Sequence, residues 1–319
     1  MTTTPAPDAG EPLSVGNVIN TGFRLYGAKF KEYVGIAARA TLGLFLIYLA
    51  IALVVLAFVV AELPPALLGI LIPAAIVAFF YAIAHYASEM GLISRLAFGE
   101  LTAQPETVEA ARRVIRPRKW QFLLNSVLVG LIFVGVFLPF YILLVIIIAV
   151  GAGVTIAGGG GEPSVGVIAA LGLLMLVLLP VLVVILYRVW ARLFAAEVPL
   201  AIEPGVGASK SIGRIWSLTK GSVWRIALIA FVISCIMLPV SLVTQLIASF
   251  LQIGLTAALP EQTPGIISGL STLLGSAFGL LVNIVILPLW QVIKSVIYLD
   301  LRTRREGFGL ELRDRKPEL

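Results

Sequence analysis

The sequence predicts an all-α, polytopic membrane protein whose six transmembrane helices form three hairpins, with amphipathic interfacial helices on the cytoplasmic side. Composition is the first observation: 60% of the 319 residues are hydrophobic and only 13% are charged, whereas soluble domains contain about 45–50% and about 25%. The second is the spacing of the apolar residues, which gather into six runs nearly free of charge. Each run is long enough to span, since about 20 helical residues cross a hydrocarbon core of about 30 Å. We expect the chain in a bacterial plasma (inner) membrane or in a thylakoid membrane.

The chain begins with a short polar stretch. Residues 1–13 are small, polar and proline-bearing, which predicts a disordered cytoplasmic tail. Ser14 is the expected N-cap of a helix, because an apolar stripe recurs behind it at helical spacing. The stripe consists of Val15, Val18, Ile19, Phe23 and Tyr26. Such a helix is predicted to lie in the headgroup plane with its apolar face towards the membrane.

Residues 14–306 are predicted to form one membrane domain that contains all six spans. The spans cover residues 34–60, 66–88, 121–150, 166–187, 225–254 and 267–293. Three short connections, 61–65, 151–165 and the stretch that holds PEQTP, contain no Lys or Arg. All 23 basic residues lie in the N-terminal approach, in 89–120, in 188–225 and from Lys294 onward. Positive charge concentrates in cytoplasmic loops, so both termini, including the tail 307–319, are expected in the cytoplasm.

Each long cytoplasmic connection is predicted to carry a further amphipathic helix. Pro105 is expected to open the first helix and Ser209 to cap the second. The two stripes consist of Val108, Ala111, Val114 and Ile115, and of Ile212, Ile215, Trp216 and Thr219. Gly221 is expected to turn the second surface helix into the fifth span. The three approaches to the membrane resemble one another, either through an internal triplication or through the shared physics of inserting a helix.

Aromatic and basic side chains cluster at these approaches, and Trp favours the membrane–water interface. The expected interfacial anchors are Trp120, Trp216, Lys220, Trp224 and Arg225. Arg39 is expected to extend its side chain to the headgroups. A basic surface beside the membrane attracts anionic lipid, by about 1 kcal/mol per residue. The predicted partners are therefore anionic headgroups on the cytoplasmic side and a membrane protein, with no nucleic acid.

Motifs for catalysis and metal binding are missing from the sequence. The single Cys235 and the single His85 exclude a disulfide and a multi-histidine metal centre. Ser271 and His85 would imitate a hydrolase dyad, but the topology places them near opposite faces of a core about 30 Å thick. We therefore expect a non-enzymatic protein without a metal or a cofactor.

Spans 5 and 6 share a polar face inside the membrane. It consists of Ser241, Gln245 and Ser249 in span 5, and of Ser271, Gly275, Gly279 and Asn283 in span 6. Small residues allow helices to approach closely and amides can bond across them, so helix packing is one interpretation. A pocket for a solute or a lipid headgroup is the other. No acidic residue lies at mid-membrane depth, which disfavours a proton-driven carrier.

Three segments resemble a known family: SVGNVINTGFRLYGAKFKEYVGIA (14–37), WSLTKGSVWRI (216–226) and YLDLRTRREGFGLEL (298–312). They are similar to six-span bacterial membrane proteins that include the membrane domain fused to some glycerophosphodiester phosphodiesterases. GLISRLAFGELTAQPE (91–106) is similar to stand-alone cyanobacterial members. The resemblance implies the six-helix architecture but transfers no catalytic residue. The membrane helices occupy the chain, and one histidine cannot supply the metal and acid–base centre of the phosphodiesterase domain.

Three classes of function remain after these exclusions. The leading hypothesis is a structural, accessory or assembly component that contacts anionic lipid or a membrane partner. The alternative is a transporter or channel that uses the polar face of spans 5 and 6. A lipid-modifying enzyme ranks last, because no residue set for it is present.

Overall fold

The structure, a computed structural model, describes residues 13–60, 64–157, 165–258 and 264–310, which fold as helices without a strand. The α-helices are α1 (Val15–Ala28), α2 (Phe30–Val60), α3 (Leu68–Leu101), α4 (Val108–Ile115), α5 (Lys119–Ala157), α6 (Val165–Leu193), α7 (Val198–Ile202), α8 (Ala208–Leu218), α9 (Val223–Ala258) and α10 (Pro264–Glu306). Short 3₁₀ turns cover Pro65–Leu67 and Arg116–Arg118.

Six of these helices, α2, α3, α5, α6, α9 and α10, are long and apolar enough to cross a membrane. The predicted all-α, six-span class is therefore confirmed for the described residues. Consecutive long helices contact each other, yet α10 also packs on α2 and α3, so the grouping into three hairpins stays a prediction. The tail segments 1–12 and 311–319 lie outside the described residues.

The structure confirms one of the three predicted helix starts. Ser14 caps α1, because its hydroxyl accepts a hydrogen bond from the N–H of Asn17 at 3.1 Å. Helix α4 begins at Val108 with Thr107 as its N-cap, so Pro105 lies two residues before the cap and does not open the helix, contrary to the prediction. The cap of α8 is Gly207 and not Ser209, so that serine lies in the first turn of the helix. Gly221 turns the chain into α9 with a φ of 83°, as predicted.

Two spanning helices run further than the apolar runs indicate. Helix α5 continues to Ala157 through part of the connection expected at 151–165, and α10 continues to Glu306 beyond the span end expected at 293. Gly151 and Gly153 lie inside α5 and do not end it, because a helix keeps all backbone hydrogen bonds inside the segment, which favours it wherever water is scarce.

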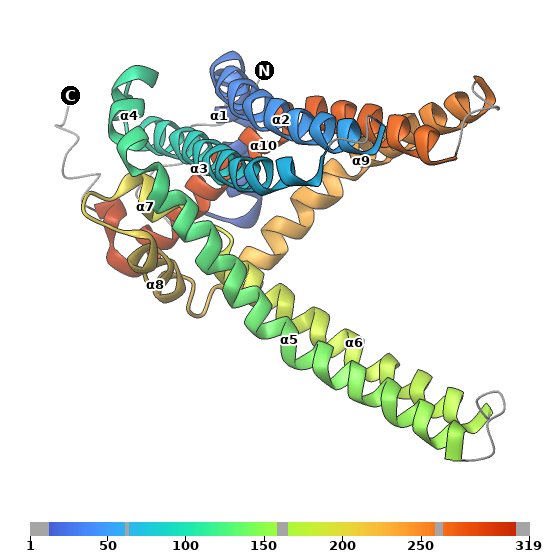
Figure 1. Cartoon of the computed structure of the whole chain (residues 1–319). Helices are drawn as coiled ribbons and strands as arrows, with labels where there is room; N and C mark the ends of the chain where they lie inside the picture. Colours follow the sequence, from blue (N-terminus) through green and yellow to red (C-terminus); the bar gives the residue numbers. More distant parts are fainter. Residues whose placement is uncertain (1–12, 61–63, 158–164, 259–263, 311–319) are drawn as a thin grey trace.

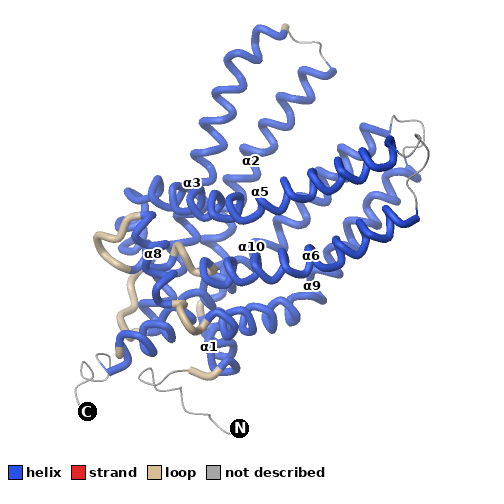
Figure 2. Tube along the Cα trace, turned by 90° about the horizontal axis from the view of Figure 1, so that it is seen from below, coloured by secondary structure: helices blue, strands red, loops and turns tan. Residues whose placement is uncertain are grey.

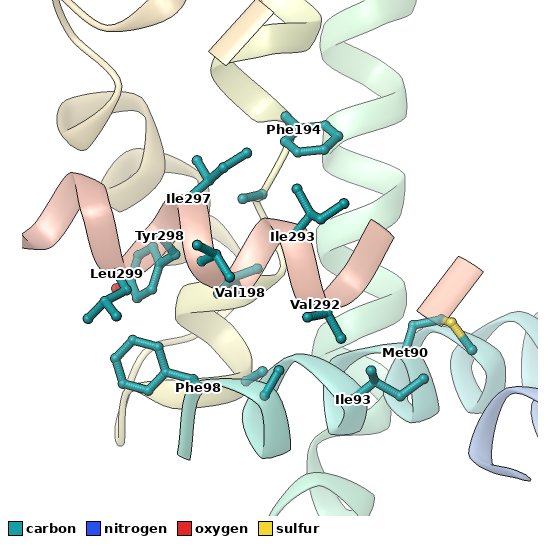
Figure 3. Packing of buried hydrophobic residues seen from close by; sticks show 14 of the residues in the cluster. Met90, Ile93, Phe98, Phe194, Val198, Val292, Ile293, Ile297, Tyr298 and Leu299 are labelled. Atoms are coloured by element: carbon teal, nitrogen blue, oxygen red, sulfur yellow. The ribbon is translucent and has the colours of Figure 1, made fainter. Parts of the chain in front are cut away.

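The hydrophobic core occupies one end of the bundle, which we call the packed end. It comprises α1, α4, α7, α8 and the adjoining parts of the long helices, where the buried residues concentrate: 33–41, 82–98, 122–125, 191–201, 223–233 and 284–301. Helix α10 runs through it and packs against α1, α2, α3 and α9. In Figure 3, Phe194 after α6 lies on the side of Ile293 of α10, and Met90 and Ile93 of α3 lie on the side of Val292.

Most apolar stripe residues of the short helices face this core, whereas Val114 of α4 and Trp216 of α8 are exposed. Val18, Ile19 and Tyr26 of α1 are buried, and Val15 and Phe23 pack against the same cluster. The hydroxyl of Tyr26 donates a 2.6 Å hydrogen bond to the carbonyl of Val285 in α10. The short helices thus use their apolar faces to join the ends of the spans.

Away from the packed end the helices separate. Figure 1 shows α5 and α6 running together away from the other spans, and Figure 2, from another direction, shows α2 and α3 leaving the bundle. Large apolar side chains along the outer parts of α5 and α6, such as Leu131, Val134, Leu173 and Leu176, are exposed. These surfaces suit contact with acyl chains, because nothing in the described chain covers them.

Candidate functional sites

A basic pocket lies at the packed end, where α2 and α3 meet α4 and the start of α5. It encloses about 200 Å³. Its lining consists of Arg39, Tyr81, His85, Ser88, Glu89, Arg112, Ile115, Arg116 and Lys119. Four basic side chains and one carboxylate therefore share a small hollow.

The single carboxylate in this pocket is already neutralised. Arg112 holds Glu89 with two hydrogen bonds, from Nε at 3.2 Å and from Nη2 at 2.8 Å. Glu89 itself is buried, so this bidentate pair is firmly placed. Arg39, Arg116 and Lys119 have no carboxylate partner among the described residues. The pocket consequently carries a net positive charge.

Aromatic rings hold one of these cations in place. The ammonium of Lys119 lies 4.2 Å from the centroid of the Tyr81 ring and 5.6 Å from that of Trp120. Cation–π contacts of this kind orient an ammonium without cancelling its charge. Lys119 can therefore still bind an anion.

A larger cavity lies between α3, α5, α6, α9 and α10 and encloses about 630 Å³. Aromatic side chains form one wall: the ring centroids of Trp190 and Phe194 are 4.9 Å apart, and those of Phe194 and Trp290 are 5.7 Å apart. Lys294 lies over the Phe194 ring at 5.3 Å and forms an ion pair with Glu197. This pair supplies the only charged side chains in the lining.

Polar side chains of α10 and α3 gather where this cavity meets the packed end. The Gln291 side-chain carbonyl accepts a hydrogen bond from the Ser94 hydroxyl at 2.9 Å, and Ser295 donates to the Ser94 carbonyl at 3.0 Å. The amide NH₂ of Gln291 has no protein partner within the described ranges. The cavity is therefore polar where it meets the packed end and aromatic further from that end.

The predicted polar face of spans 5 and 6 lines a third hollow, a groove of about 460 Å³ between α9 and α10. Five of the seven predicted residues line it: Gln245, Ser249, Ser271, Gly275 and Gly279. Ser241 and Asn283 lie outside the lining, and both are exposed. The four-residue spacing of these polar and small residues predicted a shared face, because residues four apart lie on one side of a helix.

Helix packing is a poor explanation for the glycines of this groove. A Cβ atom added at Gly279 would meet no atom within 4 Å, and one added at Gly275 would meet only the Cβ of Ala248 at 3.7 Å. A G-x-x-x-G packing motif requires a backbone approach that a methyl group would block. The small residues open space here, which favours the pocket interpretation.

The predicted interfacial anchors differ in what their side chains contact. Trp120, Trp216 and Trp224 are exposed, and the guanidinium of Arg192 lies 4.4 Å from the Trp216 ring centroid. Lys220 is exposed as well. These four side chains are thus accessible, and their role as interfacial anchors stays a prediction.

Arg225, the fifth predicted anchor, points into the protein. Its guanidinium pairs with the carboxylate of Asp300 and donates to the carbonyl of Leu13. Arg304 bonds the same two residues, with 2.8 Å between its Nη2 and the Leu13 oxygen. Asp300 is only 2% exposed, so two arginines compensate one buried carboxylate.

A second charged cluster joins the segment after α7 to the end of α10. Arg214 bonds Glu203 at 3.0 Å and Glu306 at 3.0 Å, and the Tyr298 hydroxyl donates to Glu203. Burial lowers the pKa of Arg214, but its hydrogen bonds to Glu203 and Glu306 raise it more, so the net shift is upward. Arg214 therefore stays charged and fixes this corner.

The structure keeps the residues of the excluded dyad apart. Ser271 lines the groove between α9 and α10, whereas His85 lines the basic pocket. Within the described residues, no group of three or more His, Cys, Asp or Glu side chains could hold a metal ion.

Sequence reasoning missed the cavity between α3, α5, α6, α9 and α10. Glu197 and Lys294 are 97 positions apart, and each looks like an ordinary polar cap at the end of a span. A usable signal was Trp290, which lies inside the apolar run 267–293, whereas the other tryptophans lie outside the runs. Comparison with family models, with curated proteins and with solved structures gave no match.

Proposed function

We propose that this integral membrane protein has a structural or accessory role and binds anionic lipid at its packed end. The observation that carries the proposal is the basic pocket, where Arg39, Arg116 and Lys119 converge without a carboxylate partner in the described chain. The six apolar helices support the membrane location itself. The charge distribution supports placing the packed end on the cytoplasmic side, because every described Lys and Arg lies at or beside it.

The size and charge of the pocket favour a headgroup over a larger ligand. Its volume of about 200 Å³ is below the roughly 300–1,000 Å³ of sites for drug-sized molecules. A phosphate beside three unpaired cations gains about 1 kcal/mol from each near a membrane surface. Arginine adds bidentate hydrogen bonds that match a phosphate group.

The test is lipid retention after reconstitution into nanodiscs with equal parts of phosphatidylglycerol and phosphatidylcholine. We expect the protein to retain phosphatidylglycerol, and the triple variant R39Q/R116Q/K119Q to lose about 100-fold of that retention, from about 3 kcal/mol of lost attraction. The matched control is K31Q/R113Q/K210Q, which removes three exposed cations outside the pocket. Equal losses in both triple variants would overturn the proposal.

The accessory role has its own test. The exposed apolar surfaces of α5 and α6 leave room for a membrane protein partner as well as for lipid. We expect a stable protein partner on purification in mild detergent, identified by mass spectrometry. A monomer that carries neither a partner nor enriched anionic lipid would contradict the role.

Transport is the second candidate function, and the groove between α9 and α10 favours it. Its lining combines hydroxyls, amides and glycines inside an apolar span. If the groove conducts a solute, Gln245→Leu abolishes flux in proteoliposomes, whereas Asn283→Leu, which changes a polar residue outside the lining, preserves it. Unchanged flux in the Gln245 variant would reject transport through the groove.

A further inference from the structure

We propose that the cavity between α3, α5, α6, α9 and α10 binds a zwitterionic phospholipid, with the lipid ammonium beside Glu197 and the lipid phosphate beside Lys294. This site is separate from the basic pocket and does not depend on the function proposed for it. The lipid enters from the leaflet that faces the packed end.

The charges of the cavity select the class of headgroup. Glu197 and Lys294 form an ion pair whose side chains are 22% and 17% exposed, and no other charged side chain lines the cavity. A purely anionic group beside Lys294 would also lie beside Glu197, which repels it. A purely cationic group beside Glu197 would likewise be repelled by Lys294. A headgroup with one charge of each sign can pair with both residues at once, because opposite charges alternate around the four groups.

The aromatic wall of the cavity adds to the binding of the lipid ammonium. Trp190, Phe194 and Trp290 form a continuous chain of ring contacts beside the ion pair. Rings of this kind bind ammonium groups through their faces, most strongly where water is excluded. The Gln291 amide can donate to a phosphate oxygen on the opposite side, since only its carbonyl is already bonded.

The orientation of the cavity matches a lipid of that leaflet. Lys294 and Glu197 mark its end at the packed end, while Phe133 and Leu287 line it one to three turns further along α5 and α10. Polarity therefore decreases towards the membrane centre, as it does along a phospholipid. A volume of about 630 Å³ holds a headgroup and the start of the chains, which can continue between the diverging helices of Figure 1.

The experiment measures retained lipid by native mass spectrometry. The full chain is reconstituted in nanodiscs with equal parts of phosphatidylethanolamine, phosphatidylcholine and phosphatidylglycerol, then transferred to mild detergent. In the R39Q/R116Q/K119Q background, which removes the cations of the basic pocket, we expect each zwitterionic lipid to be retained about tenfold over phosphatidylglycerol, the ratio that one charge-assisted hydrogen bond supplies. If phosphatidylethanolamine is retained more strongly than phosphatidylcholine, its ammonium donates a direct hydrogen bond to the Glu197 carboxylate. If the two lipids are retained equally, the aromatic wall supplies most of the binding of the ammonium.

Variants locate this binding. Lys294→Gln and Glu197→Gln should each reduce the preference for zwitterionic lipid about tenfold. Ser234→Phe fills the apolar part of the cavity without touching a charge, and it should reduce retention of both zwitterionic lipids. The reversed pair E197K/K294E keeps the net charge and should retain them, which separates loss of binding from loss of folding.

Two controls complete the design. The basic-pocket variant R39Q/R116Q/K119Q should leave zwitterionic retention unchanged, and gel filtration should show one monodisperse species for every variant. Phosphatidylglycerol retained as strongly as the zwitterionic lipids in the R39Q/R116Q/K119Q background would overturn the proposal. So would full retention by folded Lys294→Gln and Glu197→Gln.

Discussion

The carboxylate of Asp300 accepts a hydrogen bond from the backbone N–H of Leu13 at 2.8 Å, although 287 positions separate the two residues. Arg225 and Arg304 pair with the same carboxylate and also donate to the carbonyl of Leu13. Both backbone groups of Leu13 are thus bound by charged side chains of α9 and α10. The start of the described chain is thereby fastened to the far end of the last helix.

Replacing Asp300 with Asn should destabilise the packed end. The change leaves two arginines without a counter-charge beside a buried site, and breaking such a pair costs about 3 kcal/mol. Thermal unfolding in nanodiscs should show the loss, and limited proteolysis should cut ahead of α1 more rapidly. Glu109→Gln, at an exposed carboxylate, is the control and should change neither readout. Equal unfolding temperatures for the two variants would contradict this role of Asp300.

A methyl group at Gly99 should also be destabilising. The Cβ of an alanine there would lie 2.7 Å from the backbone oxygen of Gln104, and Gln104 donates its N–H back to the Gly99 carbonyl at 2.8 Å. Because backbone must move, we expect a cost of about 1–3 kcal/mol. Gly130→Ala, where nothing lies within 4 Å, should be neutral or slightly stabilising. Denaturant titration of both variants is the measurement.

Salt should distinguish the two proposed lipid sites. Raising the salt concentration from 0.1 M to 1 M shortens the Debye length from about 10 Å to about 3 Å. Arg39 and Arg116 are exposed, so retention of phosphatidylglycerol at the basic pocket should fall several-fold. Retention of zwitterionic lipid beside the less exposed Lys294 and Glu197 should change little. A parallel fall of both lipids would contradict the separation into two sites.

Cysteine labelling should establish the direction of insertion. In a Cys235→Ser background, Ser217→Cys places the only thiol on an exposed position of α8, and Thr256→Cys places it near the far end of α9. If the packed end is cytoplasmic, an impermeant maleimide labels Thr256→Cys in intact cells and labels Ser217→Cys only after lysis. The opposite pattern would reverse the topology.

Local patterns in the sequence were sufficient for the helices. The six spans follow from apolar runs, and the Ser14 cap follows from its own side chain and the apolar stripe behind it. Such features depend on residues within a few positions, which the sequence displays directly. The predicted cap of α8 was wrong. Ser209 and Gly207 lie only two residues apart, and both residue types are accepted at an N-cap, so the local sequence does not distinguish them.

Partners of the charged side chains could not be predicted in the same way. Arg225 follows Trp224 and precedes an apolar run, so its surroundings in the sequence indicate an interface; its partner Asp300 is 75 positions away. Glu89 likewise pairs with Arg112 across 23 positions. Only the tertiary packing of α3, α4, α9 and α10 brings these groups together. The face of Gln245 and Ser249 could be predicted, because its helical spacing is local.

The separation of the outer helices has a consequence for hydrophobic mismatch. Helix α5 contains 39 residues and is about 58 Å long at 1.5 Å per residue, which exceeds a hydrocarbon core of about 30 Å. Such a helix adapts by tilting, and α5 with α6 can tilt without disturbing a core that lies at the packed end. With the lipid contacts proposed above, bilayer thickness would act on the outer parts of α5 and α6, whereas headgroup charge would act on the packed end. One chain would then respond to two separate properties of a membrane.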